Sequence, residues 1–289
     1  MQTLFLTENV SLSMVQDGLK IRNGNEHKIV SPPYIPWDAI VIQNGFGYIS
    51  FAAIRILLSL RVSIVMLDYQ GSVLGHMSPY NRRSGELKLK QMRASDDPKK
   101  CLSIAKKIVR RGYNRRGMFV DVNQASDVRE LLKLESDAAN RYWHRWKMRL
   151  DAAWLENDFK GRENPRYRAN FRAVSKVNAV LNYSYSILES ACRTAIERAG
   201  LEPDIGFLHI NRGRQQPLVY DIIELGRGWV DEAVLLWLSK PENRTGFKRL
   251  DDWVVRFKPE TTRNLIEFIS PHIKTEILWH DSREIVKWL

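Results

Sequence analysis

The residues best suited to chemistry lie in one short stretch, where a histidine and two carboxylates flank a loop rich in arginine. His209 ends the run Gly-Phe-Leu-His, and Asp221 and Glu224 follow the loop. An imidazole nitrogen and carboxylate oxygens are donors that a divalent metal accepts. Arg212 and Arg214 supply positive charge between them. A metal beside arginines indicates chemistry on phosphate groups.

The order of helix signals predicts how these donors are presented. Asp221 and Glu224 are three residues apart in a helical pattern that Pro217 opens, so both side chains leave the same side of one helix. Gly200 ends the preceding helix. We therefore expect His209 on a loop between two helices, in front of the acidic pair.

A third carboxylate lies on a helix predicted to begin near Asp127. Glu135, Ala138 and Tyr142 recur at steps of three and four residues, so this acid shares a face with small and aromatic side chains. A carboxylate on a buried face needs a partner, because burying an unpaired charge is costly. That partner could be a metal ion or an arginine, and the sequence leaves both open.

The helix before the histidine carries two asparagines one turn apart, Asn178 and Asn182, with Tyr183 close by. Asparagine inside a helix is mildly unfavourable because its side chain competes for backbone hydrogen bonds. The pair suggests a task such as orienting metal ligands or contacting DNA. We take Asn178 and Tyr183 as candidate DNA contacts, with hydrogen bonding inside the core as the alternative.

A helix predicted over residues 98–111 has an apolar face and a basic face. The basic residues are Lys99, Lys106, Arg110 and Arg111, and Arg115 and Arg116 continue the same charge. No acidic residue occurs along this helix. Because like charges repel unless an anion is bound, we expect contact with DNA backbone phosphates, and a merely solvated surface is the alternative.

Composition supports a nucleic-acid partner. The chain has 289 residues, enough for about two domains, and its 45 Lys and Arg exceed its 33 Asp and Glu by 12. This excess indicates a polyanion, with nucleic acid favoured over an anionic membrane surface or a basic enzyme without such a partner. Cys101 and Cys192 are the two cysteines, which excludes a disulfide framework and a cysteine zinc site. We expect both to be buried.

Two regions differ in their periodicity. Up to residue 79 the chain shows short β-prone runs and one helix; from residue 80 it is helical. The predicted strands are 3–6, 10–15, 19–22, 27–30, 39–42, 63–67 and 73–77, around a helix at 51–60. The later helices are predicted at 84–93, 98–111, 127–156, 174–199, 218–238 and 259–273. We predict an α+β protein with a β-rich domain, 1–79, and a larger all-α domain, 80–289.

No export or membrane signal is recognised. Residues 1–10 lack a basic start followed by an apolar core, and the most apolar run, 51–67, is interrupted by Arg55 and Arg61. We therefore expect a cytoplasmic protein without a membrane partner.

Four spaced motifs in a fixed order resemble one known family. The motifs are Glu135-x-x-Ala138-Ala139-x-x-Tyr142-Trp143, Asn178-Ala179-x-Leu181-Asn182-Tyr183, Gly200-Leu201-x-Pro203-x-x-Gly206-Phe207-Leu208-His209, and Leu218-Val219-Tyr220-Asp221-Ile222-Ile223-Glu224. Together they resemble the CRISPR-associated spacer-acquisition integrase, the Cas-one endonuclease family. The likeness covers most of the helical region, and the β-rich start suits the same family. Leu225-Gly226-Arg227-Gly228 departs from it, standing where a proline-containing turn is usual.

The resemblance implies a homodimer that dimerises through its β-rich domain and acts with the small Cas-two protein. It implies Mg²⁺ or Mn²⁺ held by Glu135, His209 and Glu224, with Asp221 supporting the site. Its DNA substrates would be double-stranded and branched, namely the protospacer and the CRISPR repeat.

The expected reaction is an in-line attack by a three-prime hydroxyl on a phosphodiester, which inserts a new spacer; water as nucleophile would instead cut DNA. Arg227 joins Arg212 and Arg214 as a candidate phosphate clamp. Three alternatives stay open: a structure-specific nuclease acting in DNA repair, a transposon-encoded integrase of the same family, and a DNA-binding scaffold without catalysis.

Overall fold

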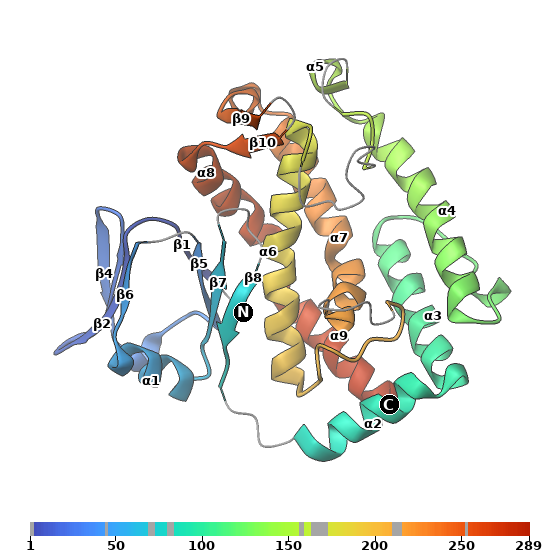
Figure 1. Ribbon diagram of the computed structural model, residues 1–289, viewed down its shortest axis with the longest axis horizontal. Helices are drawn as coiled ribbons and strands as arrows, with labels where there is room; N and C mark the ends of the chain where they lie inside the picture. Colours follow the sequence, from blue (N-terminus) through green and yellow to red (C-terminus); the bar gives the residue numbers. More distant parts are fainter. Residues whose placement is uncertain are drawn as a thin grey trace. The chain divides into compact units, whose positions relative to one another are not determined.

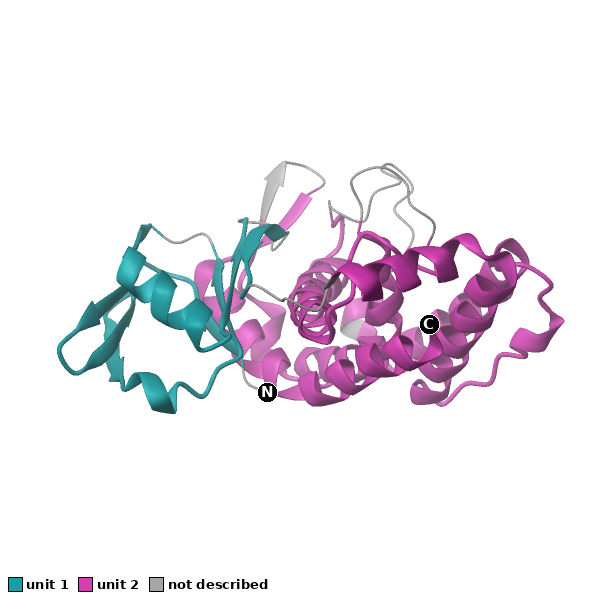
Figure 2. Cartoon of the chain, turned by 90° about the horizontal axis from the view of Figure 1, so that it is seen from below, with its two compact units in different colours: residues 1–82 teal, residues 83–289 magenta. Residues whose placement is uncertain are grey.

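A computed structural model describes residues 3–43, 46–68, 73–79, 84–155, 159–162, 173–209, 216–251 and 254–289. The chain forms two compact units, residues 1–82 and 83–289 (Figure 2). This division falls shortly after the predicted boundary at residue 79.

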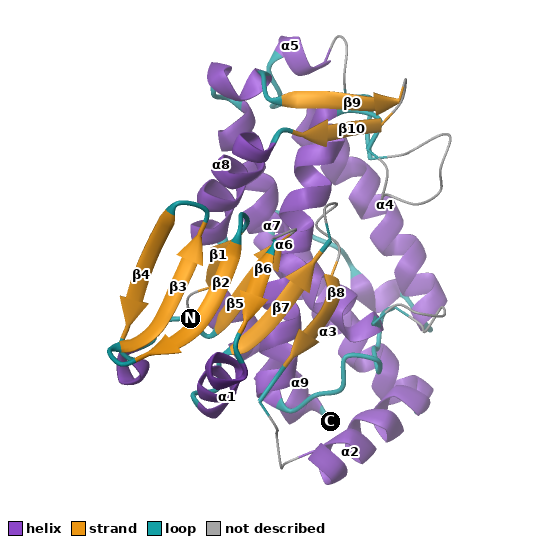
Figure 3. Cartoon of the chain, turned by 60° about the vertical axis from the view of Figure 1, so that its left-hand side comes forward, coloured by secondary structure: helices purple, strands orange, loops and turns teal. Residues whose placement is uncertain are grey.

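The described residues of the smaller unit form two four-stranded sheets, one α-helix and one short 3-10 helix, Pro32–Tyr34 (Figure 3). The first sheet has the order β1 (Thr3–Leu6), β5 (Ala39–Gln43), β7 (Ser63–Leu67) and β8 (Val73–Met77). The second has the order β4 (Glu26–Val30), β3 (Gly18–Asn23), β2 (Val10–Val15) and β6 (Gly47–Ile49). In the first sheet β1, β5 and β7 run parallel, whereas β8 pairs antiparallel with β7.

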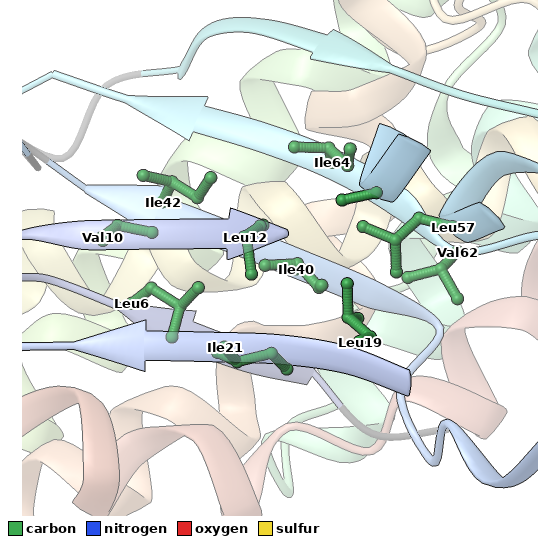
Figure 4. Packing of buried hydrophobic residues seen from close by; sticks show 11 residues of the cluster. Leu6, Val10, Leu12, Leu19, Ile21, Ile40, Ile42, Leu57, Val62 and Ile64 are labelled. Atoms are coloured by element: carbon green, nitrogen blue, oxygen red, sulfur yellow. The ribbon is translucent and has the colours of Figure 1, made fainter. Parts of the chain in front are cut away.

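The core of this unit follows from the two-residue period of its strands. Ile40 and Ile42 of β5 face a cluster that includes Leu12 of β2 and Leu57 of α1 (Phe51–Ser59) (Figure 4). Val41, between them, belongs to a second cluster on the opposite face. Both faces of this strand are therefore apolar, as is usual for a parallel strand.

The larger unit is built mainly from helices. They are α2 (Ser84–Asp96), α3 (Pro98–Arg115), α4 (Val128–Lys147), α5 (Ala152–Leu155), α6 (Lys176–Ala199), α7 (Pro217–Leu238), α8 (Pro259–Ile269) and α9 (Thr275–Trp288). Helices α6 and α7 lie side by side at its centre (Figure 1), with α3 packed on α7 and α9 on α6. Gly200 ends α6 in the left-handed conformation, with φ 80°, and Pro217 opens α7, as the sequence predicts.

Two glycines let α3 approach α7 closely. An added Cβ at Gly112 would lie 2.8 Å from the carbonyl oxygen of Glu224, and one at Gly228 would lie 3.2 Å from that of Arg115. The Leu225-Gly226-Arg227-Gly228 run lies inside α7 and does not form a turn. Its second glycine makes room for α3 beside the acidic pair.

The predicted fold class is confirmed, with four differences in detail. The predicted helix over 127–156 is interrupted between α4 and α5, and short strand β6 and helix α9 were not predicted. The prediction that the second domain is all-α is wrong, because β9 (Phe247–Asp251) and β10 (Val254–Phe257) form an antiparallel hairpin in it. Val255 packs there with Ala173 and Ala179, so the hairpin covers the start of α6.

Cys101 and Cys192 are buried free thiols, as expected. Within the described ranges, no helix has the length and apolar character needed to cross a bilayer.

Candidate functional site

Asp221 fixes the chain that carries His209. Its side chain is fully buried, and its carboxylate accepts hydrogen bonds from the backbone N–H groups of Phe207, at 2.7 Å, and His209, at 3.0 Å. Its Oδ1 also lies 2.8 Å from His209 Nδ1. Asp221 therefore sets the direction of the imidazole ring, and its contact uses Nδ1 rather than Nε2.

The same contact changes the proton affinity of the histidine. Burial lowers the pKa of His209, but the hydrogen bond and negative charge of Asp221 outweigh burial and raise it above its ordinary value. The acid thus serves as a support for the histidine, because its oxygens are occupied by the backbone and the ring.

Glu224, one turn further along α7, lies between two guanidinium groups. Its Oε2 accepts a hydrogen bond of 2.7 Å from Arg116 Nη2, and its Oε1 lies 3.1 Å from Arg227 Nη1. Burial opposes ionisation, but Arg227 and Arg116 outweigh it and lower the pKa of Glu224 to about 2. This buried carboxylate is therefore ionised at neutral pH.

Glu135 approaches the site from α4. Tyr113 of α3 donates a hydrogen bond of 2.7 Å to its Oε1. Burial raises the pKa of Glu135, and the nearby charge of Glu224 raises it further. The two carboxylates are close enough to repel, which is the condition that a shared cation relieves. The direct hydrogen-bond partner of this acid is thus a tyrosine hydroxyl, and the charges of Arg227 and Arg116 act on it as well.

The donors fit a divalent metal in kind. Glu135 and Glu224 bring carboxylate oxygens, and His209 brings the nitrogen that Asp221 does not use. In the part of the chain that the structure describes, no three His, Cys, Asp or Glu side chains are gathered closely enough for one ion. An ion at Glu224 would also compete with Arg116 and Arg227 for its oxygens.

A second buried acid follows Glu224 on α7. Asp231 accepts hydrogen bonds from Tyr142 Oη, at 2.7 Å, and from Tyr185 Oη. Its backbone oxygen accepts one from Trp146 Nε1, at 3.1 Å. Burial raises the pKa of Asp231 above its ordinary value. This network ties α4 and α6 to α7 and so holds the helix that carries Glu135 near the one that carries Glu224.

The asparagines of α6 hold an arginine. Arg162 Nη1 donates to Asn178 Oδ1 and Asn182 Oδ1, each at 3.0 Å, and its guanidinium lies over the ring of Tyr185. Asn178 also donates to the Gly161 carbonyl, at 3.0 Å. These contacts correspond to the core hydrogen-bonding alternative.

Tyr183, the other candidate DNA contact on α6, is 4% exposed and packs edge-on against Phe257. Burial of Asn178 and Tyr183 disfavours direct DNA contact.

The sequence predicts that the charges on the basic side of α3 are uncompensated, and the structure shows acidic partners for several of them. That expectation is wrong for Arg111 and Arg115, which both bind Asp281 of α9, and for Arg116, which binds Glu224. The acids come from other helices, so the local sequence did not reveal them. Arg110 donates to Asn123 Oδ1 at 3.2 Å, whereas Lys99 is exposed and Lys106 is half-buried.

Two predicted phosphate clamps, Arg212 and Arg214, lie outside the described residues. Arg227 is placed beside Glu224, and its guanidinium also lies over Tyr185. Sequence reasoning missed Tyr113 and assigned Arg116 to DNA phosphates, whereas the two residues contact the two candidate metal ligands Glu135 and Glu224 directly. The one available signal was their position at the end of the amphipathic helix.

Comparison with known proteins gives the family of this chain. The family model "CRISPR associated protein Cas1" matches residues 4–119 and 114–270, so the chain belongs to the Cas1 family. One relative, "CRISPR-associated endonuclease Cas1 2" of Pyrobaculum aerophilum, is 30% identical over 253 residues, covering 79% of this chain and 80% of the relative.

Several solved structures share the fold of this chain. A "Casposase bound to integration product" superposes with a TM-score of 0.85 at 25% identity, covering 100% of this chain and 90% of that one. A CAS1 protein from Thermotoga maritima superposes with a TM-score of 0.82 at 17% identity, covering 99% and 96%. A "TtCas1-DNA complex" gives 0.69 at 18% identity, covering 98% and 90%. A "Cas6-RT-Cas1--Cas2 complex" gives 0.76 at 17% identity, covering 99% of this chain and 35% of that one.

Proposed function

We propose that this Cas1-family chain is a divalent-metal-dependent DNA endonuclease and integrase that inserts new spacers into a CRISPR array. The observation that carries the proposal is the electrostatic coupling of Glu224 to two side chains, the carboxylate of Glu135 on another helix and the imidazole of His209, which a buried acid orients. The relatives named as endonucleases and the neighbour bound to an integration product support the same reaction class.

When bound, Mg²⁺ or Mn²⁺ would promote ionisation of the attacking three-prime hydroxyl and neutralise charge at the phosphodiester. Glu135, Glu224 and the Nε2 atom of His209 are the proposed ligands. Each is positioned by a neighbour: Tyr113 orients Glu135 and Asp221 orients His209.

Arginines complete the site. Arg116 keeps Glu224 ionised and in place through a buried ion pair, in which the two side chains are 2% and 6% exposed. Arg227 is 31% exposed and stands where a substrate phosphate could share it. We assign the same clamping role to Arg212 and Arg214.

The assay for this proposal is joining of a duplex with a free three-prime hydroxyl to a repeat-containing target, in Mn²⁺ or Mg²⁺. Glu135→Gln should lower joining and cleavage by about a hundredfold or more, while DNA affinity is retained because most of it comes from phosphate contacts. Asp137→Asn, an exposed acid on the same helix, is the matched control and should behave as wild type. Wild-type joining by Glu135→Gln would overturn the ligand assignment.

A transposon-encoded integrase is the alternative with its own support, because the casposase neighbour covers the whole chain. It would prefer transposon ends over CRISPR repeats as donor and target. A repair nuclease would cleave branched DNA without inserting it. Running the three substrates side by side with the Glu135→Gln control separates these activities.

We also propose that the chain acts as a homodimer with a Cas2 partner. The β-rich unit exposes large apolar side chains, including Phe46, Tyr48 and Phe51 at 85%, 62% and 87%, and exposed strand edges favour pairing. Two copies would supply two sites for two DNA ends. Light scattering that finds only monomer at micromolar concentration would count against the dimer.

A further inference from the structure

A basic hollow lies between α3 and the end of α9 in the larger unit. Its volume is about 540 Å³, within the range of ligand pockets, and its lining residues are Lys107, Arg110, Arg111, Asn114, Arg115 and Trp288. Among the described residues that line it, none is acidic. Four cations and one amide therefore face the same space, to which Lys107 and Trp288 contribute as residues that the sequence did not single out.

The cations of this α3–α9 hollow are held in place before any ligand arrives. Lys107 Nζ lies 4.8 Å from the ring centroid of Trp288, and Arg111 Cζ lies 5.3 Å from it. Asp281, 3% exposed, accepts from Arg111 at 2.9 Å and from Arg115 at 2.6 and 3.0 Å. Side chains already fixed lose less entropy on binding, so the hollow is organised for an anion.

The local charge balance remains positive. Asp281 and Glu284 are the acids facing these residues, and Glu284 itself binds Lys287. Against them stand the four lining cations and Lys287. The excess favours a ligand that carries several negative charges.

Helix α3 links the hollow to the candidate catalytic site. Arg115 donates to the carbonyl of Leu225, at 3.0 Å, while the next residue, Arg116, binds Glu224. Between residues 107 and 116 a helix rises roughly 14 Å, a distance that corresponds to about four phosphates along one strand of a duplex. A strand bound at Glu224 would therefore bring further phosphates to the hollow, an argument that does not extend to an acidic peptide.

We propose that the α3–α9 hollow is a subsite for DNA backbone phosphates, a few nucleotides from the phosphodiester that reacts. The inference rests on the proposed function, because Glu224 as a proposed metal ligand marks where the reacting phosphodiester would lie. Of the DNA contacts expected on α3, it keeps Arg110 and Arg111, leaves out Lys99 and Lys106, and adds Lys107.

The direct experiment removes two accessible cations. Lys107→Gln combined with Arg110→Gln should weaken binding of a labelled, branched duplex by roughly tenfold and reduce the slope of log affinity against log salt by about one to two units. Lys240→Gln combined with Lys248→Gln removes the same charge from exposed positions beyond the far end of α7 and should change neither quantity by a comparable amount.

Replacing one DNA phosphate at a time with a neutral linkage shows which phosphate is contacted. A methylphosphonate within about four positions of the reacting phosphate should weaken wild-type binding and have no further effect on the Lys107→Gln, Arg110→Gln protein. Unchanged affinity and salt slope in that variant, or a methylphosphonate effect that persists in it, would overturn the subsite. Loss of binding to a Cas2 partner with full DNA affinity would overturn it as well, and would assign the hollow to a protein.

Strand joining by the wild-type protein separates this inference from the function on which it rests. If wild type joins DNA ends and the double variant binds DNA normally, the function stands and the subsite is wrong. If wild type joins no DNA but the double variant loses affinity and salt dependence, the subsite stands and the integrase function is wrong.

Discussion

Two buried acids on one face of α7 are held in opposite ways. Glu224 contacts the guanidinium groups of Arg116 and Arg227, and its pKa falls to about 2. Asp231, seven residues later, contacts the hydroxyl groups of Tyr142 and Tyr185, and its pKa rises. Both side chains are buried, but at Glu224 the direct guanidinium contacts outweigh burial, whereas at Asp231 burial outweighs the tyrosine hydrogen bonds and the charges of Arg116 and Arg227. The acid proposed for metal binding is held by guanidinium groups, whereas the acid that joins helices contacts hydroxyl donors.

The amide substitution Glu224→Gln is expected to have the largest effect and tests this contrast between the two acids most directly. It removes the negative charge but leaves Arg116 buried, and losing one partner of a buried ion pair costs about 3–5 kcal/mol. We expect urea denaturation in a chelator to show a loss of that size. A loss below about 1 kcal/mol would mean that the arginines do not depend on this carboxylate.

The pH dependence of stability sharpens the same point. The pKa of Glu224 is lowered from 4.5 to about 2, so the stability it contributes is present above about pH 4.5 and is lost as pH falls toward 2. The difference between wild type and Glu224→Gln, measured in a chelator, should therefore shrink on acidification. For Asp231 the sign is opposite: its pKa is raised, so its ionisation opposes folding as pH rises. Asp231→Asn should lose relative stability toward low pH.

A smaller loss of stability is expected when one arginine is removed from Glu224, and an exposed arginine pair provides the comparison. Arg227→Met removes a charged hydrogen-bond partner from Glu224 and should cost about 1.5–3 kcal/mol in urea denaturation. Arg149→Met is the control, because Arg149 and Glu232 are 54% and 53% exposed and such pairs contribute about 0–1 kcal/mol. Equal losses would place the Glu224 pair among ordinary surface contacts.

The smallest effect is expected at the second acid. Asp231→Asn keeps the shape and one accepting oxygen, and tyrosine hydroxyls can donate or accept, so the cost should be about 1 kcal/mol. Tyr142→Phe should cost a similar amount. If Asp231→Asn were as damaging as Glu224→Gln, the hydroxyl partners would require the charge, and the contrast between the two acids would fail.

The sequence predicted much of the fold because periodicity and end signals are local. All seven predicted strands and the helix starting at Phe51 are present, and Gly200 and Pro217 delimit their helices as expected. Strand β6 was missed because three residues are too few to show a period. The break between α4 and α5 and the β9–β10 hairpin depend on what those segments pack against.

The candidate site also has one part that the sequence predicted and one part that depends on tertiary packing. The donor residues Glu135, His209 and Glu224 could be named from motif order, because side-chain type is written in the sequence. Their partners could not, since Arg116 meets Glu224 across 108 residues and Arg111 meets Asp281 across 170. A helical period identifies the face that is buried but not the helix that covers it. Only the packing of α3 against α7 and α9 decided which charges are neutralised and which line a hollow.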